Sequence, residues 1–239
     1  MEAIKNITNE IRKNNGIVRE KYADFNLNVG LNYFKEIGQA FIDAQHNKLP
    51  GKERVLFELD PVYTIAKMMV EWTYLINEKL DSQKGFILKG HTGRGKTFLF
   101  KVWSKFLELD AIKYMQNGDL RLIRPVIVNV RQISSEFQDP ATGGNAVLLK
   151  YSRINCLVLD DIGAEQKTSS NYGNKINVVE EIIRRREEAN MLTFGTTNLN
   201  RMEVSKENPD GYDSRTVSRM NSLFNILPVS HETDFRLKN

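Results

Sequence analysis

The stretch GHTGRGKT, residues 90–97, constrains the fold of this chain more than any other part of its sequence. It directly follows the apolar residues 86–88, and residues 97–107 after it have the pattern of a helix. Its glycines allow a tight turn in which backbone N–H groups face one point, toward which the positive end of the helix is also directed. The pattern therefore predicts a phosphate-binding loop between a buried strand and a helix.

The residue types in this loop suit a bound nucleotide. Lys96 can reach the β- and γ-phosphates, and the Thr97 hydroxyl can ligate Mg²⁺. For His91 we expect the backbone to matter more than the ring. The predicted nucleotide-binding residues are Gly90, His91, Thr92, Gly93, Arg94, Gly95, Lys96 and Thr97.

From Gly85 onward, short apolar runs alternate with segments of helical periodicity. Strands are expected at 86–88, 126–130, 156–159, 191–195 and 224–229, and helices at 97–107 and 178–188. This alternation predicts an α/β three-layer sandwich with a parallel five-stranded sheet. Ligands of such sheets bind at the carboxyl ends of the strands. The phosphate-binding loop, an acidic pair and the run 196–198 all lie at such ends, so they should form one site.

The acidic pair ends the apolar run LVLDDIG. We expect Asp160 to act on Mg²⁺, directly or through water, and Asp161 to polarise the water that attacks the γ-phosphate. Asn198 ends the neighbouring apolar strand, and its amide can hold that water or the γ-phosphate. An Asx turn at a strand end is the alternative interpretation of Asn198.

The first part of the chain, residues 1–54, has helical periodicity of its own. The residues that recur at helical spacing are Ile4, Ile7, Ile11, Phe34, Ile37, Phe41 and Ile42. They predict either helices packed on the main domain, 55–239, or a partner-binding arm. The run LPGKE, 49–53, breaks this pattern, and Asp60-Pro61 then predicts the start of a helix that extends to about Leu80.

Composition excludes several classes of protein. The 239 residues are 41% hydrophobic and 27% charged with a net charge of +4, which suits a globular domain and permits contact with nucleic acid. The one cysteine, Cys156, lies in an apolar run and is expected to be a buried thiol, so disulfide frameworks and cysteine-based zinc sites are excluded. We find neither a signal-peptide pattern nor an apolar run of membrane-spanning length, and expect a soluble cytoplasmic protein without membrane contact.

The motifs GHTGRGKT, LVLDDIGAE, FGTTNL and RTVSRM, in this order, resemble those of the AAA+ ATPases of the bacterial helicase-loader group. This is the DnaC and DnaI type, and the IstB-type transposition ATPases are close kin. The resemblance covers roughly residues 55–229. It implies a P-loop NTPase with ATP or ADP and Mg²⁺ as cofactors. It also implies a nucleotide-gated switch that assembles on single-stranded DNA and delivers a replicative helicase.

Three features depart from the wider AAA+ pattern. Many members have Glu where this chain has Asp161, and because Asp is one methylene shorter we expect slow hydrolysis. Ten residues follow Val229, so no C-terminal helical lid domain is expected. Residues 1–50 match neither the zinc-containing nor the short helical N-terminal part of known loaders.

The resemblance also places an arginine finger between the fourth and fifth strands. Arg215 and Arg219 are four residues apart and would share one helix face. The SRM sequence favours Arg219, which would act on the nucleotide of a neighbouring subunit in an ATP-dependent homo-oligomer. An exposed basic helix face is the alternative interpretation.

Other basic residues carry weaker predictions. Arg184, Arg185 and Arg186 are expected on a solvated helix face. Residues 138–153 resemble a mobile loop, from which Lys150, Tyr151 and Arg153 could contact DNA by phosphate pairing and base stacking, or form ordinary surface.

Three functions remain compatible with the sequence. The first is an ATPase that loads a helicase or regulates a transposase. A P-loop small-molecule kinase is the second, although we find no arginine-bearing lid over the phosphates. The third is an ATP-regulated binding module with negligible turnover. Phosphate release with and without single-stranded DNA, together with a screen of metabolites as acceptors, would separate them.

Overall fold

The computed structural model describes residues 17–18, 25–45, 55–116, 119–165, 168–171, 174–199, 211–231 and 235. Helices in these ranges are α2 (Leu27–Gln45), η1 (Asp60–Val62), α3 (Tyr63–Tyr74), α4 (Lys96–Asp110), α5 (Val130–Gln138), α6 (Asn145–Arg153), α7 (Val178–Glu188) and α8 (Ser214–Leu223). The strands are β1 (Ile17–Val18), β2 (Gly85–Lys89), β3 (Lys113–Gln116), β4 (Asp119–Leu122), β5 (Val126–Asn129), β6 (Cys156–Ile162), β7 (Ser169–Asn171), β8 (Asn174–Ile176), β9 (Leu192–Thr197) and β10 (Phe224–Pro228).

Five of the strands form the predicted parallel sheet. Their order is β10-β2-β9-β6-β5, and every neighbouring pair is parallel. The strand that carries the phosphate-binding loop, β2, therefore lies between β9 and β10, and β9 separates it from β6. Because all five strands run in one direction, their carboxyl ends meet at one edge of the sheet, which confirms the α/β prediction.

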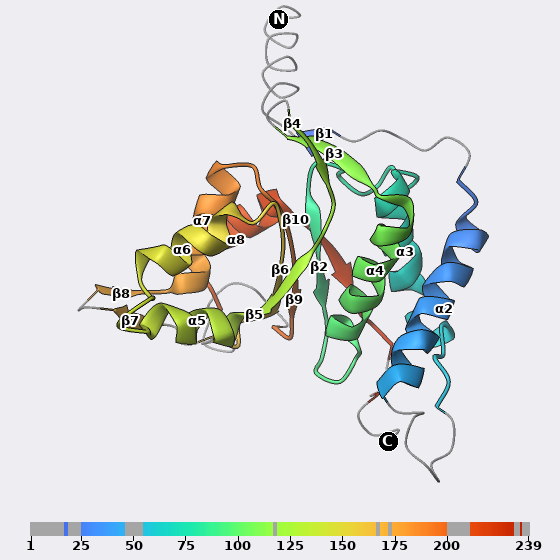
Figure 1. The fold of residues 1–239 in the computed structure, drawn as a ribbon, viewed down its shortest axis with the longest axis horizontal. Coiled ribbons are helices and arrows are strands. Elements are labelled where there is room, and N and C mark those ends of the chain that lie inside the picture. The colour runs from blue at the N-terminus through green and yellow to red at the C-terminus, as the bar shows by residue number, and fades with distance from the viewer. Residues whose placement is uncertain are drawn as a thin grey trace, which may run out of the picture.

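Helices cover both faces of this sheet (Figure 1). α2, α3 and α4 lie on one face, and α5, α6, α7 and α8 lie on the other. The strands supply apolar side chains to both cores in alternation: Phe86 and Leu88 belong to the first core, and Ile87 belongs to the second. This double burial explains why the strand sequences are continuous apolar runs and not alternating ones.

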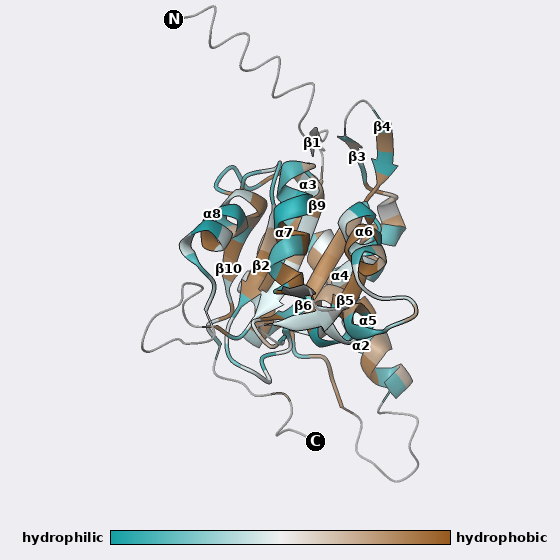
Figure 2. Cartoon of the chain, turned by 90° about the vertical axis from the view of Figure 1, so that its left-hand side faces the viewer, coloured by the Kyte–Doolittle hydropathy of each residue, from teal (hydrophilic) through white to brown (hydrophobic). Residues whose placement is uncertain are grey.

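The hydropathy of the chain follows the same layers. Figure 2 shows mostly hydrophobic strands in the interior, whereas the outward side of α7 is hydrophilic. Within the described part of the chain, no helix is both long and apolar enough to cross a lipid bilayer.

A small antiparallel sheet was not predicted from the sequence. β3 and β4 form a hairpin between α4 and β5, and β1 pairs with β3. β1 lies in the N-terminal region, between the two runs of helical periodicity at residues 4–11 and 34–42. The helical residues Phe34, Ile37 and Phe41 do lie on α2, whereas Ile4, Ile7 and Ile11 are outside the described residues.

Two predicted elements have different bounds in the structure. The helix expected to reach Leu80 ends at Tyr74, because Leu75 adopts a left-handed conformation with φ of 58°. Residues 145–153, expected in a mobile loop, form α6, whose apolar side chains Val147, Leu148 and Tyr151 are buried. The run Ala141-Thr142-Gly143-Gly144, which is typical of a loop, lies just before this helix.

Candidate functional site

The phosphate-binding loop connects β2 to α4 at the carboxyl edge of the sheet (Figure 1). Gly93 and Gly95 have φ of 81° and 75°, values that a residue with a Cβ rarely adopts. The loop borders a pocket of about 490 Å³, a size typical of small-molecule sites. Its lining residues are Thr92, Gly93, Arg94, Gly95, Lys96, Thr97, Phe98, Lys101, Arg131, Asp161, Ala164, Asn198 and Phe235.

Lys96 joins the two sides of this pocket. Its ammonium donates to the Gly90 and His91 carbonyl oxygens, both at 2.7 Å, and to Asn198 Oδ1 at 2.6 Å. The side chain is buried, so its positive charge is held in place by these oxygens. Gly90 and His91 therefore contact Lys96 through their backbone, and they do not line the pocket.

Thr97 and Asp160 meet across the loop and β6. Thr97 Oγ1 donates to Asp160 Oδ1 at 2.7 Å, and Thr196 Oγ1 on β9 donates to the same oxygen at 2.8 Å. A hydroxyl and a carboxylate at this separation are the oxygen ligands that Mg²⁺ prefers, and they directly follow the loop that would hold phosphate. The residues present thus fit the metal that the resemblance implies.

A β-bulge directs both aspartates toward the site. In a regular strand Asp160 and Asp161 would point to opposite faces of the sheet. The register of β6 against β9 shifts between Leu159 and Ile162, and Asp161 has a left-handed φ of 63°. Asp160 consequently contacts Thr97, while Asp161 lines the pocket.

Three polar residues in or directly after the neighbouring strands β5 and β9 hold Asp161. Its N–H donates to Thr196 Oγ1 at 2.8 Å, and its carboxylate accepts from Asn129 Nδ2 at 3.2 Å and from Asn198 Nδ2 at 3.5 Å. The Asn198 amide thereby bridges Lys96 and Asp161. Sequence reasoning missed the role of Asn129, although its position at the end of the run VIVN was a usable signal.

Arg131 was also missed. It follows Asn129 by two residues, lines the pocket, and donates from Nε to the Ala164 carbonyl at 3.0 Å. Arg94, which was predicted to contact nucleotide, also lines the pocket, but its guanidinium donates to the carbonyl of His231.

Glu165, which ends the DDIGAE motif, is turned toward the protein interior. It accepts from the Gly163 N–H at 2.8 Å and from the hydroxyl of Tyr212. Burial, together with the Glu165 carboxylate, raises the pKa of Tyr212 well above its ordinary value. Glu165 therefore links the loop after Asp161 to Tyr212. Tyr212 directly precedes Asp213, which is the N-cap residue of α8.

The candidate finger residues lie on α8, away from the pocket lining. α8 begins at Ser214 and connects the region after β9 to β10, as the resemblance implied. Arg215 is exposed and Arg219 is half-buried. Neither residue lines the pocket of its own chain, so their roles stay predictions.

Two other predictions for basic and aromatic residues are wrong. Tyr151 is buried, and its hydroxyl donates to Glu136, so its ring is not available to stack on a base. Arg186 is not on a solvated face: its exposed fraction is 0% and it donates to backbone carbonyls, including those of Tyr151 and Leu192. Spacing alone could not show which of three consecutive arginines faces inward.

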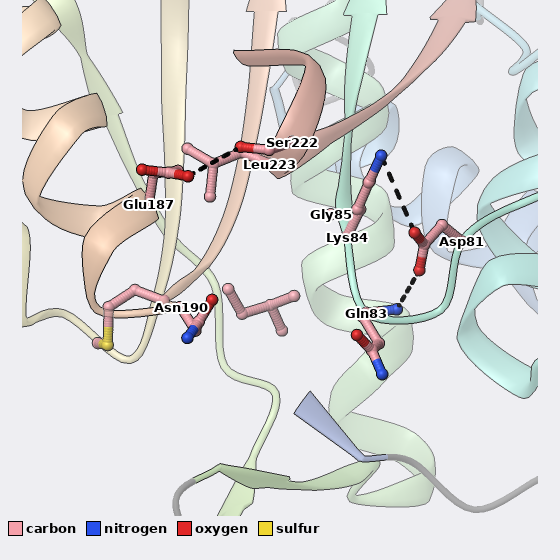
Figure 3. Close-up of a pocket in the computed structure, with 10 residues that line it drawn as sticks. Asp81, Gln83, Lys84, Gly85, Glu187, Asn190, Ser222 and Leu223 are labelled. Carbon is pink, nitrogen blue, oxygen red and sulfur yellow. Dashed lines mark hydrogen bonds and ion pairs between the residues drawn. The ribbon is translucent and has the colours of Figure 1, made fainter. Parts of the chain in front are cut away.

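A second, smaller hollow lies at the opposite edge of the sheet (Figure 3). Its volume is about 130 Å³, and its lining includes Gly85 and Leu192, the first residues of β2 and β9. Asp81 and Lys84 approach one another at 3.9 Å on one side, and Ser222 donates to Glu187 at 3.4 Å on the other. We assign it no part in the nucleotide site, because the phosphate-binding loop is at the other ends of these strands.

Comparison with solved structures shows the fold. One similar structure is that of DnaI, with 20% identity, a TM-score of 0.51, and coverage of 84% of this chain and 93% of that chain. Another is a protein from Streptococcus pyogenes serotype M3 described as a candidate primosome component, with 16% identity, a TM-score of 0.50, and coverage of 72% and 81%. No family model and no curated protein matches the chain. The chain thus shares the α/β fold of these two structures, which agrees with the resemblance at the level of the fold.

Proposed function

We propose that this chain is an AAA+ ATPase that binds ATP with Mg²⁺, hydrolyses it slowly, assembles on single-stranded DNA and loads or regulates a replicative helicase in DNA replication. The observation that carries the proposal is the convergence of Lys96, Thr97, Asp161 and Asn198 on one pocket, with Asp160 hydrogen-bonded to Thr97. Such a convergence of a phosphate-binding lysine, metal-binding oxygens and a second carboxylate matches the requirements of phosphoryl transfer.

Nucleotide binding would use the loop and Lys96. In this structure the ammonium is bonded to Asn198 and to two loop carbonyls. A γ-phosphate beside Lys96 would offer the ammonium charged oxygens, which accept stronger hydrogen bonds than neutral ones. Asn198 would then be free to exchange its lysine contact for the phosphate or the attacking water.

Hydrolysis would need the metal site and Asp161 together. Thr97 and Asp160 would hold Mg²⁺, which neutralises charge on the β- and γ-phosphates when it is bound. Asp161 would accept a proton from the attacking water, and Asn129 and Asn198 would keep its carboxylate directed at the pocket. Because the side chain of Asp is shorter than that of Glu, the Asp161 carboxylate would lie farther from the attacking water. We therefore expect slow hydrolysis.

Assembly would bring a second chain to the pocket. The Arg219 finger would stabilise charge on the γ-phosphate of a neighbouring subunit, so ATP would hold subunits together and hydrolysis would release them. The proposal of a helicase loader is supported by the fold shared with DnaI and by the DDIGAE, TTNL and SRM sequences. IstB-like regulation of a transposase is the alternative with the same site chemistry.

The proposal is tested by measuring phosphate release and DNA binding together. The wild-type protein should bind a single-stranded oligonucleotide more tightly with ATP than with ADP, and binding should weaken steeply with salt, because backbone phosphates dominate such contacts. Lys96→Ala should abolish ATP binding and, with it, the nucleotide dependence. Equal DNA binding with ATP and ADP would contradict the loader role, whereas unchanged nucleotide affinity of folded Lys96→Ala would contradict the ATP site itself.

A panel of small-molecule acceptors completes the test. A kinase would consume ATP only when an acceptor is present and would release ADP with no inorganic phosphate. Basal or DNA-stimulated phosphate release without any acceptor is the expected result.

A further inference from the structure

Two buried polar side chains meet at the end of the DDIGAE motif. Glu165 and Tyr212 have exposed fractions of 7% and 0%, and the Tyr212 hydroxyl donates to the Glu165 carboxylate. Neither of these described residues lines the nucleotide pocket. A buried carboxylate is unfavourable unless hydrogen-bond donors satisfy it, so the Tyr212 hydroxyl is a contact that Glu165 needs.

The same carboxylate also holds the turn that carries Asp161. Its second oxygen accepts from the Gly163 N–H at 2.8 Å, and the Ala164 N–H donates to the Asp161 carbonyl at 2.9 Å. Gly163 has φ of 95°, so the turn is built on a conformation that few other residues adopt. Glu165 thus joins the turn after Asp161 to a hydroxyl from a distant part of the sequence.

Tyr212 brings this hydroxyl from the start of α8. It directly precedes Asp213, the N-cap residue, whose carboxylate accepts from the Thr216 N–H at 2.6 Å. The Tyr212 ring belongs to the same apolar core as Val178 and Met220, so its packing does not depend on the hydroxyl. Removal of the hydroxyl alone should therefore leave the ring and α8 in place while the carboxylate loses a donor.

We propose that Glu165 and Tyr212 are positioning residues for ATP hydrolysis, and that their hydrogen bond holds Asp161 where it can activate the attacking water. The inference rests on the proposed function, in which Asp161 is the general base, and adds what fixes the backbone of that base. Without the Tyr212 hydroxyl, the buried carboxylate would move toward other donors and release the Gly163 N–H, so the turn would relax. A displacement of about 1 Å at reacting groups can lower a rate about 10²-fold.

The test separates the binding of ATP from its hydrolysis. The full chain is assayed with Mg²⁺ and single-stranded DNA: calorimetry measures the ATP dissociation constant, and single-turnover phosphate release measures the rate. Tyr212→Phe should keep the ATP dissociation constant within about twofold, because Lys96 and Thr97 are unchanged. Its rate of hydrolysis should fall about 10- to 100-fold.

Tyr151→Phe is the matched control. The Tyr151 hydroxyl also donates to a carboxylate, that of Glu136 at 2.7 Å, and both residues are outside the described pocket lining. Each Tyr→Phe substitution removes one hydrogen bond to a glutamate and keeps the ring. Rates are compared under conditions in which urea unfolding curves show both variants fully folded, and Tyr151→Phe should keep the wild-type rate.

A double-mutant cycle shows whether the two residues act through one bond. Glu165→Ala should slow hydrolysis at least as much as Tyr212→Phe, and the double variant should be no slower than Glu165→Ala alone. If Glu165→Ala does not fold, the cycle uses Glu165→Gln, whose amide offers one acceptor oxygen for two donors. Losses that multiply in the double variant would contradict a shared role.

A mixed oligomer tests whether the bond acts within its own chain. Tyr212→Phe and wild type are each mixed in equal amounts with Lys96→Ala, which supplies an intact α8 but no ATP-binding pocket. Tyr212→Phe should remain slower than wild type in this mixture, because the turn that carries Asp161 belongs to the same chain as the pocket. Recovery to the wild-type rate would show that the bond serves the neighbouring subunit through α8, and would overturn the inference.

Three further results would also overturn it. An unchanged rate in Tyr212→Phe would show that the bond does not position Asp161. An equal loss of rate in Tyr151→Phe would assign the effect to stability alone. A loss of ATP affinity as large as the loss of rate would show that the bond supports binding and not hydrolysis. These results leave the proposed function in place, whereas failure of the wild-type protein to bind or hydrolyse ATP would contradict the proposed function as well.

Discussion

Asp161 combines a strained backbone with a position in the pocket. A left-handed conformation costs a non-glycine residue roughly 1 kcal/mol or more, although Asp and Asn tolerate it better than other residues. Here the strain is compensated by the bond from the Asp161 N–H to Thr196 and by the two amides on its carboxylate. The bulge that creates the strain is also what places both aspartates on the nucleotide side.

Asp161→Asn is expected to separate nucleotide binding from hydrolysis. Asn adopts the same left-handed backbone, and Thr97 with Asp160 still provides the metal site, so affinity for ATP with Mg²⁺ should be retained. Phosphate release should fall at least tenfold, because loss of a general base costs about 10²–10⁴ in rate. Calorimetry and a phosphate assay measure the two properties. The matched variant Asp160→Asn should instead weaken Mg²⁺-dependent binding, and unaffected turnover in Asp161→Asn would show that Asp161 is not the base.

At the scale of elements, α7 uses its arginines on two sides. Arg184 and Arg185 both donate to Glu181 on the outer side, and Arg184 also pairs with Glu188. Arg186 faces inward, where it accounts for carbonyls at the end of α6 and the start of β9. Burial lowers the pKa of Arg186 to about 10, so the guanidinium stays charged at neutral pH. α7 thus binds α6 and β9 through the buried hydrogen bonds of Arg186, while its outer face carries charged side chains.

Glu181→Gln should destabilise the protein in a pH-dependent way. Hydrogen bonds from Arg184 and then Arg185 lower the pKa of Glu181 from 4.5 to about 2. A carboxyl with a depressed pKa contributes its full stability above its unfolded pKa and loses it as the pH falls through the folded value. We expect a loss of about 1 kcal/mol in the free energy of unfolding at pH 7, since partly exposed pairs are screened by solvent.

Urea unfolding of wild type and Glu181→Gln at pH 7 and near pH 2 measures this effect. The difference between the two proteins should shrink as the pH falls from 4.5 toward 2. Glu188→Gln, which removes a single and more exposed partner of Arg184, is the control and should have a smaller effect. A difference that persists undiminished at low pH would assign the stability to packing and not to charge.

For the whole molecule, sheet order decides which groups share the nucleotide pocket. β9 separates β2 from β6, so the loop after β2, the acids of β6 and the Asn198 that follows β9 are neighbours at one edge. α8 leads directly into β10, and neither Arg215 nor Arg219 on α8 lines this pocket. A finger on α8 would therefore act on the pocket of another chain, which would make hydrolysis a property of the assembly.

Mixing two inactive variants tests this arrangement. Arg219→Ala should bind ATP as a monomer but lose ATP-dependent assembly and turnover, whereas Lys96→Ala should lose ATP binding. In a mixed oligomer some interfaces combine an intact loop with an intact Arg219, so part of the phosphate release should return. Arg215→Ala is the matched control on the same helix and should keep most of its activity. Full activity of Arg219→Ala alone, or an inactive but well-mixed sample, would exclude a finger that acts between subunits.

Local sequence determined the elements that bear the chemistry. The run 86–88, the glycine loop and the helical pattern after it are contiguous, and local contacts and backbone propensities specify them. The apolar strands were recognisable because both faces of the sheet are covered, and α7 lies at the predicted 178–188. The principal site residues could be named for the same reason, since each lies in or directly after a recognisable strand or loop.

Tertiary structure decided how these elements meet. The bulge at Asp161 depends on pairing with β9, a strand more than 30 residues away. No local sequence pattern therefore predicts this bulge. Burial of Arg186 and Tyr151 depends on how α6 packs on α7, which periodicity does not report. The contact of Phe235 with the phosphate-binding loop links residues far apart in sequence, and only the path of the chain after β10 brings them together. Local propensity acts over a few residues, whereas strand pairing and packing act between distant residues. The complete site depends on strand pairing and packing.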